Sequence, residues 1–600
     1  MKKIIELLCV GAAALSLCAC NDFLDRPTVD NYNVSNFYKT DDQVEQGVNY
    51  LYNSPWYDFQ RAFIKIGEVM SGNMYWGGSP YLDFTTNGTD VDLINMSYSL
   101  WAVNGHCNTV INNILNSEGP SNEAKMQYIG EALTWKAFAY FFMVRTFGEV
   151  PIVHDNTELL GTGEYNSVSK VEKADVYEYI ILTLEKAMEL LPKNPYIGKY
   201  NRIDRFAAEA LLAKVYLTKA GLSGSLSTAD LAKAAELAYD VIKNSGRKLT
   251  PNYEDVFRLS PTVFNATGEC LISWQWTAQG SQWTRQNTLQ SDLAIEGFGD
   301  QGDLWGGWGG PSVDLANAFG VCAADNPEVR KGEKDVRRKA TMMLPGDIYP
   351  YFWTNKGGFN FIQFLYDSSY SKAPGMQCQT GAHNVKHLYG NDADHVAALG
   401  HTPANMSYTL PTHLLRLSDV YLIYAEAVLA TNPAEALQYV NEVRTRAGAE
   451  PLASVDYKDI WKERRLELAG EGDNWYDFVR RSYYQMDTVI SELKAQKRST
   501  YNNLADVYKY FAEEEKWDIT FLTESTEDGK YVSGYVEGKK RQVWYGDNGV
   551  KGKEDNPNVT KESFQLPFPT EDVVFNANMA SSAAPIHVDV RNTYSYDFIK

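Results

Sequence analysis

The sequence has 600 residues, of which 44% are hydrophobic and 22% are charged, and both values are ordinary for a globular protein. Such a length suggests several domains and is enough to bury a sizeable core. The 56 basic and 76 acidic side chains give a net charge of −20, which repels nucleic acids and anionic lipid surfaces. Nucleic acid is therefore excluded as a partner, whereas neutral ligands such as sugars suit the 13% aromatic content.

The N-terminus resembles a secretory signal. Two lysines precede an apolar run that is too short to cross a bilayer, which takes about 20 apolar residues. The run ends in Leu17-Cys18-Ala19-Cys20, which resembles a bacterial lipobox. We therefore predict that residues 1–19 are removed and that Cys20 carries a lipid anchor. An ordinary signal peptide that is cleaved nearby is the alternative.

Four cysteines remain beyond the signal, and they are widely spaced: Cys107, Cys270, Cys322 and Cys378. No CxxC motif occurs among them. The pattern is therefore neither a disulfide scaffold nor a zinc site, although one incidental disulfide stays open.

Helical periodicity dominates much of the remaining chain. Thr40 or Asp41 can cap a first helix that runs to Tyr52. Residues 124–147 form a long apolar-periodic segment that ends before Gly148. Further segments of this kind lie at 171–191, 204–219, 228–243, 413–430, 433–447, 456–469 and 474–485.

These helices come as pairs with small residues at recurrent positions. Ala213, Ala234, Ala425 and Ala436 are examples, and the pattern resembles tetratricopeptide repeats, in which a small residue allows two helices to cross closely. One pair cannot bury its own apolar face, so the pairs must stack. We predict a mostly α fold with a helical-repeat scaffold at about 120–245 and 410–490.

Long segments of a different kind interrupt the helices, at about 53–105, 245–410 and 490–565. They are rich in Gly, Asn, Asp, Tyr and Trp, and their periodicity is weak. Loops of this length are usually functional or act as linkers, and their aromatic content argues against disordered linkers. No linker divides the chain, so residues 20–600 are predicted to be one unit with irregular, partly β insertions.

Five blocks in the expected order carry a family resemblance. They are 21–27 (NDFLDRP), 130–153, 205–221, 410–448 and 460–480. Together they resemble the SusD/RagB family, which are outer-membrane lipoproteins of Bacteroidetes that bind glycans at the cell surface. The departures from the family pattern are Trp135 and Asn474, where Arg is common, Gly470, where an aromatic is common, and Phe478 in place of Leu.

The resemblance implies a role as well as a fold. In the family, helical repeats form the scaffold, irregular segments build the ligand face, and the protein is a lid on a TonB-dependent SusC-like transporter. It implies a surface-exposed, lipid-anchored protein of the outer membrane that passes oligosaccharide or polysaccharide to that transporter.

A charged string between 463 and 480 invites a catalytic interpretation. A glycoside hydrolase needs two carboxyl groups about 5–10 Å apart beside an open subsite. Here the acids alternate with arginines at helical spacings, which favours structural ion pairs: Glu463, Arg464, Arg465, Glu467, Glu471, Asp477 and Arg480. No catalytic residue is therefore predicted, and the protein is not expected to be an enzyme.

Two regions offer candidate metal ligands. One holds Cys378, His383, His387, Asp392, Asp394, His395 and His401, without an HExxH motif. The other holds Asp547, Asn548 and Asp555, which lack the spacing of an EF-hand loop. We predict no cofactor and no metal; a structural calcium ion stays open without support.

Aromatic residues in glycine-rich loops are the candidate sugar contacts. An exposed indole or phenol can stack on the apolar face of a sugar while amide and acid side chains bind its hydroxyl groups. Two segments fit, 73–81 and 300–311. The candidates are Asn73, Tyr75, Trp76, Tyr81, Trp283, Asp303, Trp305, Trp308 and Trp353.

Core packing is the alternative role for any aromatic residue. It is the prediction for Trp135, Trp461 and Trp475, which lie on predicted helices, and for at least one of Trp274 and Trp276. Three functions stay in competition: a non-catalytic glycan-binding lipoprotein, a peptide-binding relative that serves peptide uptake, and, with least support, a surface glycoside hydrolase. No motif names the glycan or its linkage.

Overall fold

The structure is a computed structural model, and it covers most of the chain after the predicted signal. The residues that it describes are 37–193, 202–259, 268–277, 286–300, 306–321, 328–329, 332–344, 346–366, 369–371, 378, 380–403, 408–498, 534–536, 541–543 and 556–597.

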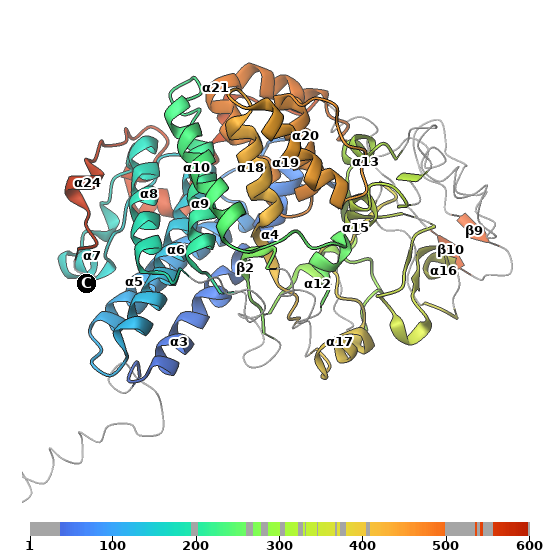
Figure 1. Ribbon diagram of the computed structural model, residues 1–600, viewed down its shortest axis with the longest axis horizontal. Helices are drawn as coiled ribbons and strands as arrows, with labels where there is room; N and C mark the ends of the chain where they lie inside the picture. Colours follow the sequence, from blue (N-terminus) through green and yellow to red (C-terminus); the bar gives the residue numbers. More distant parts are fainter. Residues whose placement is uncertain are drawn as a thin grey trace, which may run out of the picture.

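Helices make up one side of the molecule, and short strands and loops make up the other (Figure 1). The long helices are α3 (Asp41–Asn49), α5 (Val91–Leu115), α6 (Asn122–Phe147), α8 (Lys173–Leu190), α9 (Arg205–Lys219), α10 (Thr228–Asn244), α18 (Leu417–Val428), α19 (Pro433–Arg446), α20 (Tyr457–Leu468) and α21 (Asn474–Ala495). Shorter ones are α4 (Gln60–Ile64), α7 (Asn156–Thr162), α12 (Leu289–Leu293), α13 (Val313–Phe319), α15 (Arg337–Thr341), α16 (Phe361–Tyr366), α17 (Asp392–Leu399), α23 (Thr570–Phe575) and α24 (Val590–Thr593).

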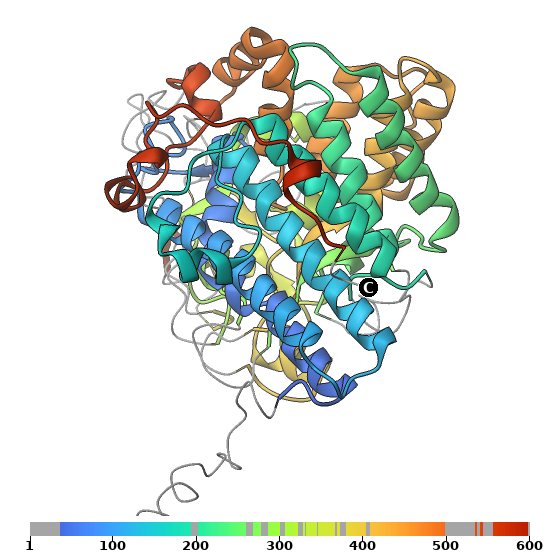
Figure 2. The same ribbon diagram turned by 90° about the vertical axis from the view of Figure 1, so that its left-hand side faces the viewer.

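The long helices pack in series, as the repeat pattern predicts. α6 lies between α5 and α8, α8 contacts α9, α9 contacts α10, and α10 contacts α18, which pairs with α19. The small residues at the crossings are fully buried, among them Ala213, Ala234, Ala425 and Ala436. Figure 2 shows this stack from the side, with the C-terminal segment running across it. The mostly α prediction and the stacked helix pairs are confirmed.

The strands form five antiparallel pairs rather than one large sheet among the described residues. They are β1 (Met74–Trp76) with β3 (Gly309–Pro311), β2 (Cys270–Trp274) with β8 (Thr412–Arg416), β4 (Met342–Met343) with β7 (His383–Asn384), β5 (Ile348–Tyr349) with β6 (Phe359–Asn360), and β9 (Gly534–Val536) with β10 (Arg541–Val543). Two of these pairs, β1 with β3 and β2 with β8, join segments more than 100 residues apart in the chain.

The prediction of irregular loops over 53–105 is wrong for much of that range. Residues 54–70 continue as helical turns, namely η2 (Ser54–Phe59), α4 and η3 (Lys65–Met70), and residues 91–115 form α5. The periodicity of α5 is weak because polar side chains such as Asp92, Asn104 and Asn108 are buried beside its apolar ones. Because these polar residues are buried among apolar ones, the sequence shows no clear apolar stripe at helical spacing, which is the usual signal for a helix.

The predicted end of the last long helix, at 485, coincides with a break inside α21. Gln485 has non-helical backbone angles, and the helix then continues to Ala495.

Most of the third predicted loop segment, 490–565, lies outside the described residues. Cys107, Cys270 and Cys378 are buried free thiols. None of the helices in the described part of the chain has the length and apolar content needed to cross a membrane.

Candidate functional site

The two glycine-rich aromatic segments that the sequence singles out meet in one strand pair. β1 runs antiparallel to β3, with Met74 opposite Pro311 and Trp76 opposite Gly309. Trp308 directly precedes Gly309, so Trp76 and Trp308 lie at the same end of this pair. The fold therefore brings together two candidate segments that are far apart in the sequence.

Both indoles reach the surface to some degree. Trp308 is 48% exposed, and Trp76 is partly buried. A Cβ atom on Gly309 would lie 2.6 Å from a carbon of the Trp76 ring, so only glycine allows this close approach of backbone to indole. We call Trp76 and Trp308, with the strand pair beneath them, the indole platform.

Charged side chains border the indole platform. The Lys65 ammonium lies 5.1 Å from the centroid of the Trp76 ring and forms an ion pair with Asp92. The Arg61 side chain is half-exposed, and its Nε lies 3.6 Å from a carboxylate oxygen of Asp292. These groups can donate and accept hydrogen bonds beside an apolar ring, which is the combination that sugar recognition requires. Neither Arg61 nor Lys65 is among the candidate residues that the sequence suggests.

The strand pair is held firmly from both sides. The Ser312 backbone N–H donates to the Asn73 carbonyl at 2.9 Å, and the Ser312 hydroxyl donates to the Gly72 carbonyl at 2.6 Å. On the other side, the Asn384 side-chain amide donates to the Gly309 carbonyl at 2.8 Å. The platform therefore rests on ordered backbone, which limits the entropy lost when a ligand binds.

The expectation of exposed side chains is wrong for Asn73, Tyr75 and Tyr81. Successive side chains of a strand point to opposite faces, so the partly exposed Trp76 places Tyr75 inside, where it is 2% exposed. Tyr81 is fully buried, and its hydroxyl donates to Asp90, the N-cap residue of α5, at 2.6 Å. The buried Asn73 amide donates to Glu68 at 3.0 Å and accepts from Arg465 at 2.7 Å.

Trp353 is also a core residue rather than an exposed one. It is 4% exposed, its indole N–H donates to the Phe298 carbonyl at 2.8 Å, and its ring packs against Phe359 and Phe364. The tryptophans that the sequence assigns to the core are mostly buried. Trp135 and Trp475 on the helices are buried, and Trp461 is half-buried. Trp274 and Trp276, in the strand-like pattern, are both buried.

The remaining candidates cannot be placed. Cys20, Trp283, Asp303 and Trp305 lie outside the described residues, as do Asp547, Asn548 and Asp555. Their predicted roles stay predictions.

The charged string of 463–480 lies in a buried ion-pair network, as predicted. Arg464 contacts Asp419 at 2.6 Å and Asp477 at 2.8 Å, while Arg480 contacts Glu426 at 2.6 Å. Burial alone would raise the pKa of Glu467, but neighbouring arginines, led by Arg446, lower it to about 2. Each of these carboxylates is paired with arginine, and this arrangement favours a structural role.

The histidine-rich segment does not form a shared metal site among the described residues. His383 lies in β7, so the four-residue spacing to His387 does not put both on one helical face. His387 contacts the Gly470 carbonyl at 2.6 Å, and His395 contacts the His401 carbonyl at 2.7 Å. In the described residues, the one group of three potential ligands is Glu172, Asp175 and His587, whose ligand atoms lie within 4.8 Å of one another.

Two family models and a relative of known family match this chain. A family model described as "SusD family" matches residues 272–580, and one described as "Starch-binding associating with outer membrane" matches residues 22–217. A SusD-like protein of Bacteroides ovatus is 31% identical over 594 residues, which cover 97% of this chain and 98% of that protein.

Solved structures show the same architecture. A crystal structure with a xylogluco-oligosaccharide is 28% identical, with a TM-score of 0.71, and the match covers 91% of this chain and 99% of that one. A laminarin-binding SusD-like protein is 22% identical, with a TM-score of 0.58 over 79% and 98% of the two chains, and shows the fold alone. By family model, by relatives along nearly its whole length and by fold, this chain belongs to the SusD family.

Proposed function

We propose that this protein is a non-catalytic, surface-exposed glycan-binding lipoprotein, anchored to the outer membrane through Cys20. It captures oligosaccharide or polysaccharide on the indole platform. The observation that carries the proposal is the strand pair that joins Trp76 and Trp308, with the Lys65 ammonium 5.1 Å from the centroid of the Trp76 ring. The relative that is solved with a xylogluco-oligosaccharide supports the same ligand class.

Replacing Trp308 with alanine should weaken glycan binding about 30-fold, because a central tryptophan typically contributes about 2 kcal/mol to an interface. Retardation in affinity gels that contain xyloglucan or other plant and algal polysaccharides measures the effect. The melting temperature should stay close to that of the unchanged protein because the side chain is half-exposed.

Tyr165→Ala is the matched control, since it removes an exposed aromatic side chain elsewhere on the surface. It should leave retardation unchanged. A large fall in melting temperature for Trp308→Ala would show that this indole belongs to the core. If no glycan retards the protein while peptides bind it, the peptide-uptake alternative replaces this proposal. Release of reducing ends would instead support a hydrolase.

We propose further that the protein passes its ligand to a TonB-dependent SusC-like transporter. Exposed apolar side chains support a protein partner: Val91 and the 68% exposed Tyr98 belong to α5, and Val574 and Phe575 belong to α23. The two helices are joined by a hydrogen bond from Ser97 to Asp572, at 3.2 Å. Exposed apolar side chains gathered in this way commonly mark protein contacts.

Changing Tyr98 and Phe575 to glutamate should disrupt the complex with the transporter, because charges buried at an interface are costly. Co-purification of the two proteins from membranes measures this, and glycan retardation in gels should stay unchanged. Recovery of the full complex with the double variant would place the transporter contact on another surface.

A further inference from the structure

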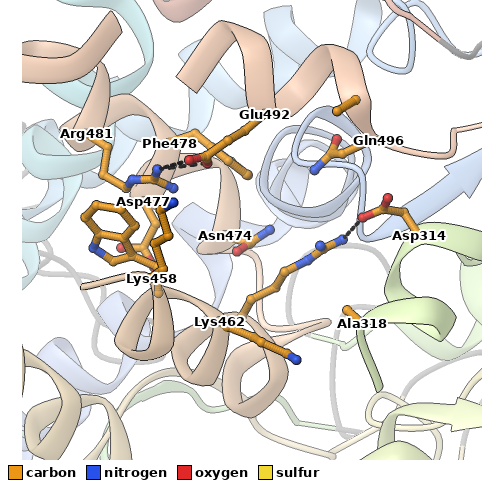
Figure 3. Close-up of a pocket in the computed structure, with 13 residues that line it drawn as sticks. Asp314, Ala318, Lys458, Lys462, Asn474, Asp477, Phe478, Arg481, Glu492 and Gln496 are labelled. Atoms are coloured by element: carbon orange, nitrogen blue, oxygen red, sulfur yellow. Dashed lines mark hydrogen bonds and ion pairs between the residues drawn. The ribbon is translucent and has the colours of Figure 1, made fainter. Parts of the chain in front are cut away.

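A cavity lies between α13, α20 and α21, beside the ion-pair network. Its volume is about 430 Å³, within the range of small-ligand sites. Four basic side chains line it: Lys458, Lys462, Arg465 and Arg481. Three of them come from one face of α20, at positions 458, 462 and 465. Figure 3 shows Asn474 between the two ion pairs of the cavity wall.

The acidic side chains of the cavity already have partners. Asp314 pairs with Arg465 at 2.8 Å, and Glu492 pairs with Arg481 at 2.7 Å. Asp477 is held by two arginines beneath the cavity floor. Lys458 and Lys462 are exposed and form no ion pair within the described part of the chain. The charge that remains available to a ligand is therefore positive, in a protein whose net charge is −20.

Two buried hydrogen-bond donors at the cavity also lack partners. The side-chain amide nitrogen of Asn474, a residue that is 6% exposed, has no hydrogen-bond partner in the described structure, and neither has the Nε atom of Arg481. Buried polar groups are nearly always hydrogen-bonded, and an unsatisfied one costs about 1–3 kcal/mol. Both unsatisfied atoms are donors, so the missing group is an acceptor.

Trp461 does not offer a stacking surface here. The Arg481 guanidinium lies 3.7 Å from the centroid of its ring, and Tyr457 stacks against it with centroids 5.8 Å apart. The cavity therefore recognises its ligand through charge and hydrogen bonds. This distinguishes it from the indole platform, where apolar ring faces are available.

We propose that this cavity binds the carboxylate of an acidic sugar residue, such as a uronic acid, within the captured glycan. A carboxylate supplies acceptor oxygens for the Asn474 amide and the Arg481 N–H, and it attracts Lys458 and Lys462. The proposal rests on the glycan-binding function and makes it more specific: acidic glycans gain a contact that neutral ones lack.

Isothermal titration with trigalacturonic acid at low salt tests the proposal, with a neutral xyloglucan oligosaccharide as a second ligand. Lys458→Gln combined with Lys462→Gln should weaken trigalacturonate binding at least tenfold and leave the neutral ligand unaffected. Asn474→Leu should weaken it as well. Lys186→Gln combined with Lys233→Gln is the matched control, since it removes the same two charges from α8 and α10 and should change neither affinity.

Three outcomes would overturn the proposal. Trigalacturonate does not bind to the unchanged protein, or both lysine pairs weaken it equally, or hexaglutamate binds at this cavity as tightly as the sugar acid. Binding of the neutral ligand that depends on Trp308, together with no uronate effect, would refute this cavity alone. Failure of every glycan would instead refute the proposed function.

Discussion

Replacing Arg416 with methionine should lower the free energy of unfolding by about 3–5 kcal/mol, because buried charges are left without their counter-ion. Arg416 is fully buried and contacts Glu269 at 2.8 Å, Glu467 at 3.0 Å and Glu471 at 2.6 Å. It lies at the end of β8, where the strand enters α18. Its loss would loosen the joint between β2, α20 and the repeat scaffold. Urea denaturation at neutral pH measures the change.

Arg591→Met provides the comparison on the surface. Arg591 also contacts two carboxylates, Glu178 at 2.6 Å and Glu185 at 2.8 Å, but its side chain is 48% exposed. Its removal should cost less than about 1 kcal/mol because solvent screens such pairs. If Arg416→Met also costs less than this, the buried network contributes little to stability.

Acidification from pH 7.5 to 5 should lower the free energy of unfolding through buried histidines, by about 2 kcal/mol for each of three of them. Burial lowers the pKa of His383 to about 3 and the pKa values of His387 and His413 to about 4. In the unfolded chain these groups titrate near 6.5, so the unfolded state binds more protons below that pH. Each neutral imidazole therefore contributes stability above pH 6.5 and loses about 2 kcal/mol of it by pH 5.

The carboxylates of the network titrate in a different range. The lowered pKa of Glu467 removes stability only below about pH 4.5, the ordinary carboxyl range. The decline between pH 7 and 5 therefore comes from buried histidines, including His154, whose pKa is also lowered to about 4. Glu209 opposes it, because burial raises the pKa of its carboxyl to about 8. His383→Leu should reduce it by about 2 kcal/mol. If the decline is the same in His383→Leu as in the unchanged protein, this imidazole is accessible to protons in the native state.

The helical scaffold could be predicted from the sequence because apolar spacing and small crossing residues are local signals. The 25-residue helix α5 escaped because it buries Asp92, Asn104 and Asn108 among apolar neighbours. Its polar residues resemble those of a loop when they are read along the chain. Burial of polar side chains depends on tertiary partners, here η2 and α6, which the sequence does not display.

The segments of the candidate site could be identified from the sequence, but the exposure of their individual residues could not. Both platform segments were identified from indoles flanked by glycine, and Trp308 is exposed. Tyr75 was assigned the same role as Trp76, although strand alternation alone separates the two. Arg61 and Lys65 could not be assigned because their helical turns approach Trp76 only in the folded chain. The cavity between α20 and α21 could not be predicted, because its basic residues belong to a charged segment whose spacing indicates ion pairs.

The antiparallel match of Met74 with Pro311 has a consequence for the order in which the protein matures. Contacts between such distant segments form late in folding, because a long loop must close before they can be made. The helix pairs, whose contacts are local, can be complete while the two indoles are still apart. We therefore expect the indole platform to be completed only at a late stage of folding, after the helix pairs have formed.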